Sequence, residues 1–375
     1  MGMKALLVGG TGPTGVPIAR GLVERGYALT VFHRGAHETP ELPACEHIHA
    51  DPHFRHTIDD ALAGRRFDLV VAAYGRLRHV GDALAGRCAQ FISVGGPLAN
   101  VGSLSPWLHR PFGMQIPVRE EDAAAFRSPD SEDPAVAFSN KVLEAERGIM
   151  ALHQKGAFSA SHFRYPIIYG PRQLLPREWS IVKRILDGRK RMILADGGLP
   201  IYAWLAARNA AEHILLAVDK PEAAAGEIFN CADERQFTVR QWTEMIADIM
   251  GCDMEMVSLP EELAKPTRWF DPLLKESSHY LPDTTKARER LGYKDVVATR
   301  EALKDFIEWL VKNPIPAEEF KHDPFDYASE DRLIAAYRRA VERIEREVPF
   351  AELSDGFHPY AHPKAPTKEK DHRGR

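Results

Sequence analysis

Short apolar runs alternate with amphipathic segments along the first 170 residues. The runs at 4–8, 29–32, 67–73 and 91–94 have the length and composition of buried strands, and a shorter segment at 47–51 fits between them. Apolar residues at helical spacing follow residue 15 and recur at 58–62 and over about 136–154. The next strand is expected at 163–169. Strands that alternate with helices predict an α/β fold built on a doubly wound parallel sheet.

The pattern changes after residue 170. Residues 179–186 mix apolar and charged positions and indicate an exposed helical layer. Thr238, with Gln241 three residues later, forms a capping box that opens an amphipathic helix, and further helices are expected at 299–312 and 329–348. These patterns predict three parts: an N-terminal domain at 1–170, whose sheet is completed by parts of 200–232, a smaller domain at 171–310, and an extension at 311–375 with a disordered tail at 361–375.

A glycine-rich loop joins the first predicted strand to the first predicted helix. Its sequence, Gly-Gly-Thr-Gly-Pro-Thr-Gly, spans residues 9–15. Glycines let the backbone approach a pyrophosphate closely, and the N–H groups of a helix N-terminus attract its charge. The strand and helix on either side supply the context that this motif requires. The loop therefore predicts a Rossmann-type dinucleotide site at 1–170, with the pyrophosphate held by Gly9, Gly12, Pro13, Thr14 and Gly15.

The end of the second strand favours NADP over NAD. A carboxylate there usually holds the ribose of NAD, but the strand ends at His33-Arg34, with no carboxylate. We expect Arg34 to stack on the adenine and pair with a 2′-phosphate, assisted by His33, although Arg34 also fits a solvated loop residue. Asp51 either accepts from the adenine amino group or caps a turn. Ala72 and Ser93, near the ends of later strands, complete the predicted cofactor site.

Composition argues against several partners and classes of site. The chain is 44% hydrophobic and 27% charged with a net charge of −4, which gives no attraction to nucleic acid or to anionic membranes. Four dispersed cysteines, no membrane-length apolar run and a chain that begins with its first strand favour a reduced, cytoplasmic protein. Its 16 histidines show no clustered ligand spacing, so no metal site is expected. The nucleophile elbow of serine hydrolases is missing from the sequence.

Several stretches resemble the extended short-chain dehydrogenases/reductases, the superfamily of sugar-nucleotide epimerases and dehydratases. They are residues 9–15, 91–93, 163–173, 226–231 and 283–293, and the resemblance covers roughly 3–310. It implies a cofactor half of seven parallel strands, a smaller C-terminal substrate half, and a small-molecule substrate in the cleft between them. It also implies a homodimer, since many relatives pair through the helix that carries the catalytic residues.

The catalytic helix departs from the pattern of this superfamily. The resemblance implies a tyrosine as general acid/base and a lysine four residues later, but no tyrosine occurs between residues 100 and 164. One register aligns Lys141 with the lysine and puts Ala137 in place of the tyrosine. The other, which we favour slightly, puts Phe138 and Val142 at these two positions. The hydroxyl residue of the superfamily corresponds to Gly95.

Other residues must therefore supply acid/base chemistry, if there is any. The candidates are Tyr74 after the fourth strand, Lys141 if burial makes it a base, and Tyr165 and Tyr169 near the cleft. Arg172, Arg177 and Arg208 are candidates for binding an anionic substrate group.

Two functions are compatible with these features. The first is an NAD(P)-dependent oxidoreductase or epimerase/isomerase-type enzyme that acts on a small polar metabolite through hydride transfer without the usual Tyr/Lys pair. The alternative is a catalytically silent regulator or scaffold that binds a dinucleotide. The acidic net charge argues against RNA as its partner.

Overall fold

The computed structural model of the chain describes residues 2–96, 106, 111–122, 134–264 and 278–349. It contains two compact units, residues 1–326 and 327–375, and each is described by itself. The predicted tail at 361–375 and most of the segment 97–133 lie outside the described residues.

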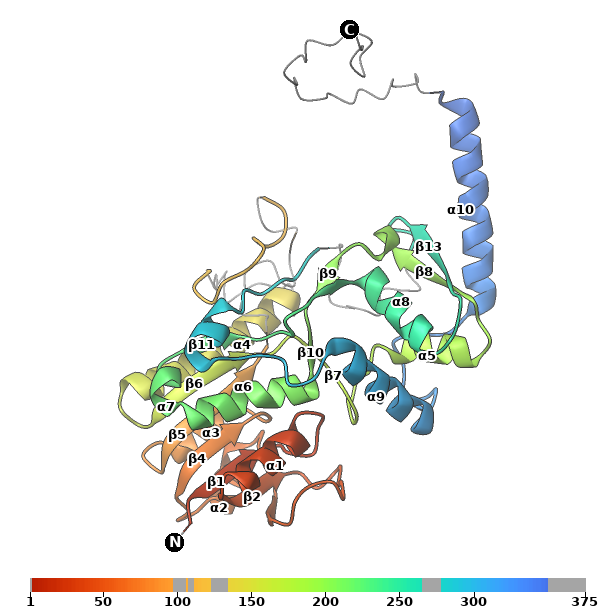
Figure 1. The fold of residues 1–375 in the computed structure, drawn as a ribbon. Helices are drawn as coiled ribbons and strands as arrows, with labels where there is room; N and C mark the ends of the chain where they lie inside the picture. Colours follow the sequence, from red (N-terminus) through yellow and green to blue (C-terminus); the bar gives the residue numbers. More distant parts are fainter. Residues whose placement is uncertain (1, 97–105, 107–110, 123–133, 265–277, 350–375) are drawn as a thin grey trace, which may run out of the picture. The chain divides into compact units, whose positions relative to one another are not determined.

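A seven-stranded parallel sheet forms the centre of the first unit (Figure 1). Its order is β11-β6-β5-β4-β1-β2-β3. The strands are β1 (Lys4–Val8), β2 (Ala28–His33), β3 (Glu46–His49), β4 (Phe67–Ala72), β5 (Cys88–Gly95), β6 (Ser159–Arg164) and β11 (Ile228–Asn230). Every pairing is parallel, which confirms the predicted doubly wound sheet.

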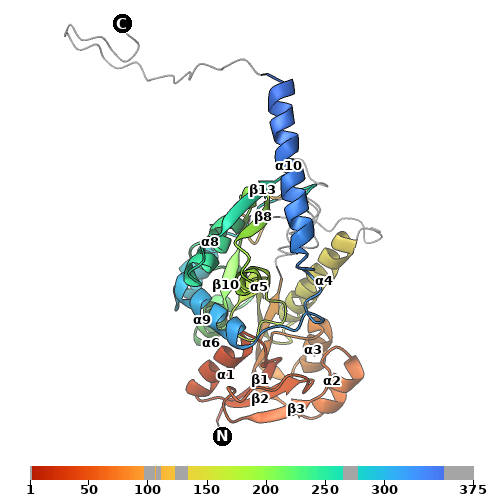
Figure 2. The ribbon, with the colours of Figure 1, turned by 90° about the vertical axis from the view of Figure 1, so that its right-hand side faces the viewer.

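Helices cover both faces of this sheet. Helices α1 (Gly15–Glu24) and α6 (Ala207–Asp219) share one apolar core with the sheet, and α2 (Arg55–Ala61), α3 (Leu77–Leu84) and α4 (Pro134–Gln154) lie on the opposite face. Figure 2 shows α1 on one side of β1 and β2, with α2 and α3 on the other. The carboxyl ends of β1, β2, β4 and β5 thereby meet at one edge, where ligands of such sheets bind.

The expected strand at 163–169 is two strands. Strand β6 ends at Arg164, and β7 (Ile167–Tyr169) pairs instead with β10 (Trp204–Ala206). Pro166 lies between them and has no N–H to continue the ladder. The chain therefore leaves the large sheet at this point and enters the smaller lobe.

A second apolar core holds the smaller lobe together. It is built on α5 (Trp179–Leu186), α8 (Val239–Ile249) and α9 (Thr299–Lys312). The remaining elements are β8 (Arg191–Ala195), which pairs with β13 (Glu255–Leu259), β9 (Ile201–Tyr202), which pairs with β12 (Phe237–Thr238), the short helix α7 (Pro221–Ala224), a 3-10 turn at Asp196–Gly198 and a π-helical turn at Ala287–Leu291.

Two expectations for this lobe have different outcomes. The capping box at Thr238 is confirmed, because its side chain accepts from the Gln241 N–H and the Gln241 side chain returns to the Thr238 N–H. The exposed layer expected at 179–186 is wrong. Trp179, Ile181 and Val182 are buried, because α5 packs against α8 and α9.

The second unit contains one long helix, α10 (Tyr327–Glu347), close to the expected 329–348. Within the part of the chain that the structure describes, no helix is both long and apolar enough to cross a membrane.

Candidate active site

The glycine loop folds tightly between β1 and α1. The Gly9 N–H donates to the Phe32 carbonyl at 2.9 Å, and the Gly15 N–H donates to the Gly12 carbonyl at 3.1 Å. Gly9 and Gly10 have φ values of 108° and 97°, which favour glycine. A Cβ on Gly15 would lie 2.3 Å from the backbone of Gly10, so only glycine fits there.

The outer side of the loop is open for a ligand. A Cβ on Gly12 would meet nothing within 4 Å. Helix α1 has no acidic residue in its first turn, and the side chain of Thr14 makes no cap hydrogen bond. The N-terminal N–H groups can therefore face a phosphate, and the loop fits the pyrophosphate of a dinucleotide.

The residues predicted to select the cofactor are distributed around the ends of β2 and β3. Arg34 is exposed, and its guanidinium lies 5.6 Å from the centre of the Tyr74 ring. Asp51 accepts from the His53 N–H at 3.0 Å, which is the turn-capping arrangement. The ring of His33 is buried, and its Nε2 lies 2.9 Å from Nδ1 of His47. The structure therefore leaves Arg34 the most accessible of the three.

A pocket of about 800 Å³ opens at the carboxyl ends of β4 and β5, beside α3 and α4. Its lining includes Tyr74, Gly95, Phe138, Lys141 and His162. Ala73 and Tyr74 connect it to the glycine loop, because a Cβ on Gly9 would lie 3.0 Å from Cβ of Tyr74. Ligands bound on the loop and in the pocket would therefore be neighbours.

Both registers considered for α4 place their residues at this pocket. Ala137, Phe138, Lys141 and Val142 all line it. Phe138 is 47% exposed, so an apolar ring faces the place where the resemblance implies a phenol. Lys141 is exposed, and the burial on which its role as a lone base would depend is therefore missing.

A buried group of polar side chains lies beneath the pocket. Strand pairing sets Ser93 opposite His162, and the Ser93 Oγ lies 2.7 Å from Nδ1 of His162. The other ring nitrogen, Nε2, lies 3.5 Å from the Glu146 carboxylate. Arg164 donates to both oxygens of that carboxylate, at 2.7 and 2.9 Å. Ser93 is thus engaged within the protein.

Gly95 determines how His162 meets the pocket. A Cβ at residue 95 would lie 2.5 Å from Nε2 of His162, so the ring can pack here only against a glycine, and Nε2 itself is buried. Among the described residues Nε2 has no hydrogen-bond partner. Burial lowers the pKa of His162 to about 4, against the opposing effect of Glu146, so the ring is neutral near pH 7. Burial, the largest single effect, would raise the pKa of Glu146, but the hydrogen bonds from Arg164 and the neighbouring basic groups together lower that pKa.

Comparison with known proteins supports the resemblance found in the sequence. A UDP-glucuronic acid 4-epimerase from Bacillus cereus, solved in complex with UDP-glucuronic acid and NAD, matches 83% of this chain and 100% of its own with a TM-score of 0.62 and 16% identity. The NAD dependent epimerase/dehydratase family model matches residues 113–232. The matched segment and the shared fold support the resemblance to the extended short-chain dehydrogenase/reductase superfamily.

Two curated proteins are similar to this chain in sequence. An uncharacterized protein of Sinorhizobium fredii, y4nL, is 27% identical over 202 residues, which cover 48% of this chain and 56% of that protein. The chain thus spans little more than half the length of that relative. A 3-diazoavenalumate denitrifying reductase of a Streptomyces species is 26% identical over 316 residues, or 78% of this chain and 96% of that protein.

The structure does not bring two of the sequence-predicted tyrosines to the pocket. The Tyr165 hydroxyl is buried and donates to the Ala210 carbonyl at 2.5 Å. The Tyr169 hydroxyl donates to the Asp233 carboxylate at 2.8 Å in the core of the smaller lobe. Both hydroxyls satisfy buried groups, and the phenol that does line the pocket is that of Tyr74.

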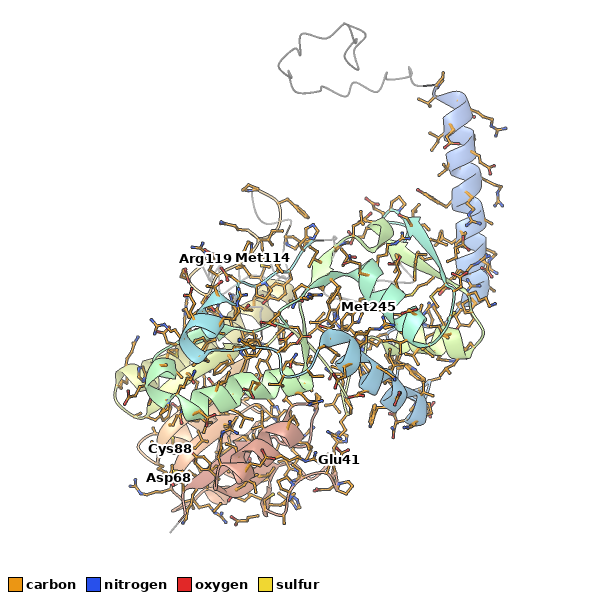
Figure 3. All side chains as sticks on the ribbon, in the orientation of Figure 1. Glu41, Asp68, Cys88, Met114, Arg119 and Met245 are labelled. Atoms are coloured by element: carbon orange, nitrogen blue, oxygen red, sulfur yellow. The ribbon has the colours of Figure 1, made fainter. Side chains whose placement is uncertain are left out.

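The candidate arginines are also distributed differently from the expectation. Arg172 forms an ion pair with Glu41, which is labelled in Figure 3. Arg208 is exposed, and its guanidinium lies 3.9 Å from Glu301. Arg177 keeps a buried guanidinium nitrogen without a hydrogen-bond partner among the described residues. None of the three lines the pocket.

Sequence reasoning missed two groups that the fold assembles. In the sequence His162 looks like an ordinary strand residue. Two features could have pointed to it: it is polar within a buried strand, and residue 95, at the hydroxyl position, is glycine. The sequence shows no clustered ligand spacing, yet the fold brings His33, Glu38, His47 and His49 together at β2 and β3. Its signal is the His-x-His pattern of residues 47–49 on a predicted strand.

Proposed function

We propose that the chain is an NAD(P)-dependent oxidoreductase or epimerase/isomerase that acts on a small polar metabolite without the usual Tyr/Lys pair. The observation that carries this proposal is the pocket at the ends of β4 and β5, which adjoins the glycine loop and contains proton-exchanging side chains. A relative named as a reductase and a neighbour solved with NAD and a UDP-sugar acid support the same class.

The glycine loop would hold the pyrophosphate, and Arg34 would favour NADP over NAD. Arg34 is exposed beside Tyr74, and it stands directly after β2, where a carboxylate would otherwise take the ribose hydroxyls. Arginine suits a 2′-phosphate because its guanidinium offers paired donors. When bound, the nicotinamide supplies hydride exchange with a substrate carbon.

His162 takes over the role of the missing hydroxyl at residue 95. Its Nδ1 is 2.7 Å from the Ser93 hydroxyl, which also lies 3.2 Å from the Ser161 carbonyl. This role requires the hydroxyl to donate to Nδ1 rather than to that carbonyl, which puts the hydrogen of the neutral ring on Nε2. That N–H would point to the place where a side chain at residue 95 would lie, and a substrate oxygen that entered there would accept from it. A neutral imidazole can polarise a carbonyl in this way without giving up its proton.

Tyr74 is the proposed proton donor and acceptor for the same oxygen. Its phenol lines the pocket from the end of β4, whereas Phe138 on α4 has no hydroxyl to offer. Lys141, exposed at the pocket, would orient an anionic substrate group through its charge. The reaction then needs no tyrosine on α4.

A silent dinucleotide-binding regulator is the second candidate. The observation that favours it is α4 itself, where the apolar ring of Phe138 and an exposed Lys141 stand in place of the catalytic pair. The homodimer and the cytoplasmic location stay predictions from the sequence, and light scattering of the purified chain tests the first of them.

The test combines binding with turnover. The purified chain is titrated with NADPH and NADH by fluorescence, and a panel of alcohols, ketones and sugar nucleotides is screened for cofactor turnover. We expect saturable binding and turnover of at least one class. The His162→Asn variant should bind cofactor normally and lose turnover, whereas His56→Asn, at an exposed position outside the pocket, should match the unmodified protein. Binding without turnover across the panel would favour the regulator, and no binding would exclude both functions.

A further inference from the structure

Three histidines and a glutamate meet on one face of the β2–β3 strand pair, outside the pocket. His33 ends β2, and His47 and His49 lie on β3. The parallel register sets His33 opposite His49 and Val31 opposite His47. Because side chains alternate along a strand, residues two apart share a face, and all three imidazoles lie on the same one. Glu38 reaches them from the connecting loop.

The spacing of these four side chains suits a small cation. One ligand atom from each lies within 4.8 Å of all the others. Nε2 of His33 is 2.9 Å from Nδ1 of His47, Nε2 of His49 is 3.2 Å from the Glu38 carboxylate, and Nε2 of His33 is 3.8 Å from it. Tetrahedral Zn²⁺ with bonds near 2.0–2.1 Å separates its ligand atoms by about 3.3 Å, inside this range.

The thiol of Cys45 contacts the ring of His47 on the side away from the other ligand atoms. Sγ of Cys45 lies 3.6 Å from Nε2 of His47. If the Nε2–H donates to the sulfur, the lone pair of Nδ1 points at the other ligand atoms. Metal-bound histidines are usually oriented by such a second hydrogen bond. The contact with the sulfur, which does not involve the four ligand atoms, thus indicates that His47 would bind a metal through Nδ1.

One proton must move before a metal can enter. The Gly35 N–H donates to Nδ1 of His33 at 3.3 Å, so the hydrogen of that ring lies on Nε2 and is shared with His47. Metal binding moves this hydrogen to Nδ1 and gives up the long contact with Gly35. The metal then takes the place of the hydrogen between His33 and His47.

We propose that His33, Glu38, His47 and His49 bind one divalent transition-metal ion of the Zn²⁺ class. Three imidazoles and one carboxylate are ligands of borderline softness, which suit Zn²⁺ and Co²⁺ better than Mg²⁺ or Ca²⁺. Four protein ligands fill a tetrahedral shell, so the ion has a structural role. It ties the loop 34–45 to the two strands that this loop connects.

The test uses the full-length chain, stripped with a chelator and dialysed against Zn²⁺ at controlled free concentration. We expect one tightly bound equivalent and a higher melting temperature. His49→Ala, whose side chain is 56% exposed and whose removal should not disturb folding, should weaken binding at least tenfold. His37→Ala is the matched control, because it lies exposed in the same loop but outside the cluster, and it should bind normally.

Substitution with Co²⁺ adds a spectroscopic readout. A tetrahedral site of nitrogen and oxygen ligands should give the intense visible bands of four-coordinate Co²⁺, and Glu38→Gln should weaken them. The proposal is overturned if less than one equivalent binds, if His37→Ala and His49→Ala weaken binding equally, or if Co²⁺ keeps the pale spectrum of the hydrated ion. These results would mean adventitious binding by surface histidines.

Discussion

Replacing His162 with asparagine removes a buried titrating group and should change how stability depends on pH. Burial lowers the pKa of His162 from 6.5 to about 4. Below pH 6.5 His162 becomes protonated in the unfolded chain, whereas in the folded chain it stays neutral until the pH approaches 4. The stability that the neutral ring contributes is therefore complete above pH 6.5 and is lost as the pH falls toward 4.

The expected magnitude follows from that shift. Between pH 7.5 and 4.5, His162 should account for a loss of about 2.5 kcal/mol in the free energy of unfolding, from 1.36 kcal/mol for each unit of pKa shift. Solvent hardly reduces this effect of burial on His162, because the residue is 1% exposed. His162→Asn lacks this loss, whatever its stability at pH 7.5.

The assay is urea unfolding of both proteins at several pH values from 4.5 to 7.5. The difference between the two free energies isolates His162, because other shifted groups, such as His213 and Asp233, are present in both. His56→Asn, at an exposed position, should follow the unmodified protein throughout. Parallel curves for His162→Asn and the unmodified chain would refute the reasoning, since they would mean that the ring titrates normally.

Three further outcomes are expected. Arg34→Ala should weaken NADPH binding about tenfold or more and NADH binding hardly at all, and equal effects in a fluorescence titration would remove the argument for NADP. Gly15→Ala should abolish dinucleotide binding and lower the melting temperature, because its Cβ would lie 2.3 Å from Gly10; unchanged calorimetric binding would contradict the loop assignment. Burial raises the pKa of Asp233 from 3.8 to about 7, so its contribution to stability is lost as the pH rises. Between pH 4 and 7 the free energy of unfolding of the unmodified protein should therefore fall by about 3 kcal/mol relative to that of Asp233→Asn in urea unfolding. A difference between the two proteins that does not change with pH would contradict the raised pKa of the buried carboxyl.

The sequence predicted those features that depend on local pattern. The strands of the large sheet, the glycine loop and the capping box at Thr238 each follow from a short run of residues. The split at Pro166 could also have been predicted, because proline lacks the N–H that a strand ladder needs. The burial of α5 was not readable, because its two covering helices lie far along the chain.

The chemistry of the pocket and of the histidine cluster depends on strand register instead. Ser93 and His162 are 69 positions apart, and only the pairing of β5 with β6 sets them side by side. His33 and His47 likewise meet because β2 pairs with β3. Side-chain type in one sequence does not report such pairings. The tyrosines expected near the cleft, Tyr165 and Tyr169, instead donate to buried acceptors, the Ala210 carbonyl and the Asp233 carboxylate.

The central claim is that the glycine loop holds a nicotinamide dinucleotide beside the pocket that contains His162. Calorimetric titration of the purified full-length chain with NADPH and NADH tests this claim most directly, with Gly15→Ala titrated in parallel. We expect one equivalent of dinucleotide to bind, NADPH more tightly than NADH, and Gly15→Ala to bind neither. If the unmodified chain binds neither dinucleotide, or if Gly15→Ala binds both as well as the unmodified chain does, the account is contradicted.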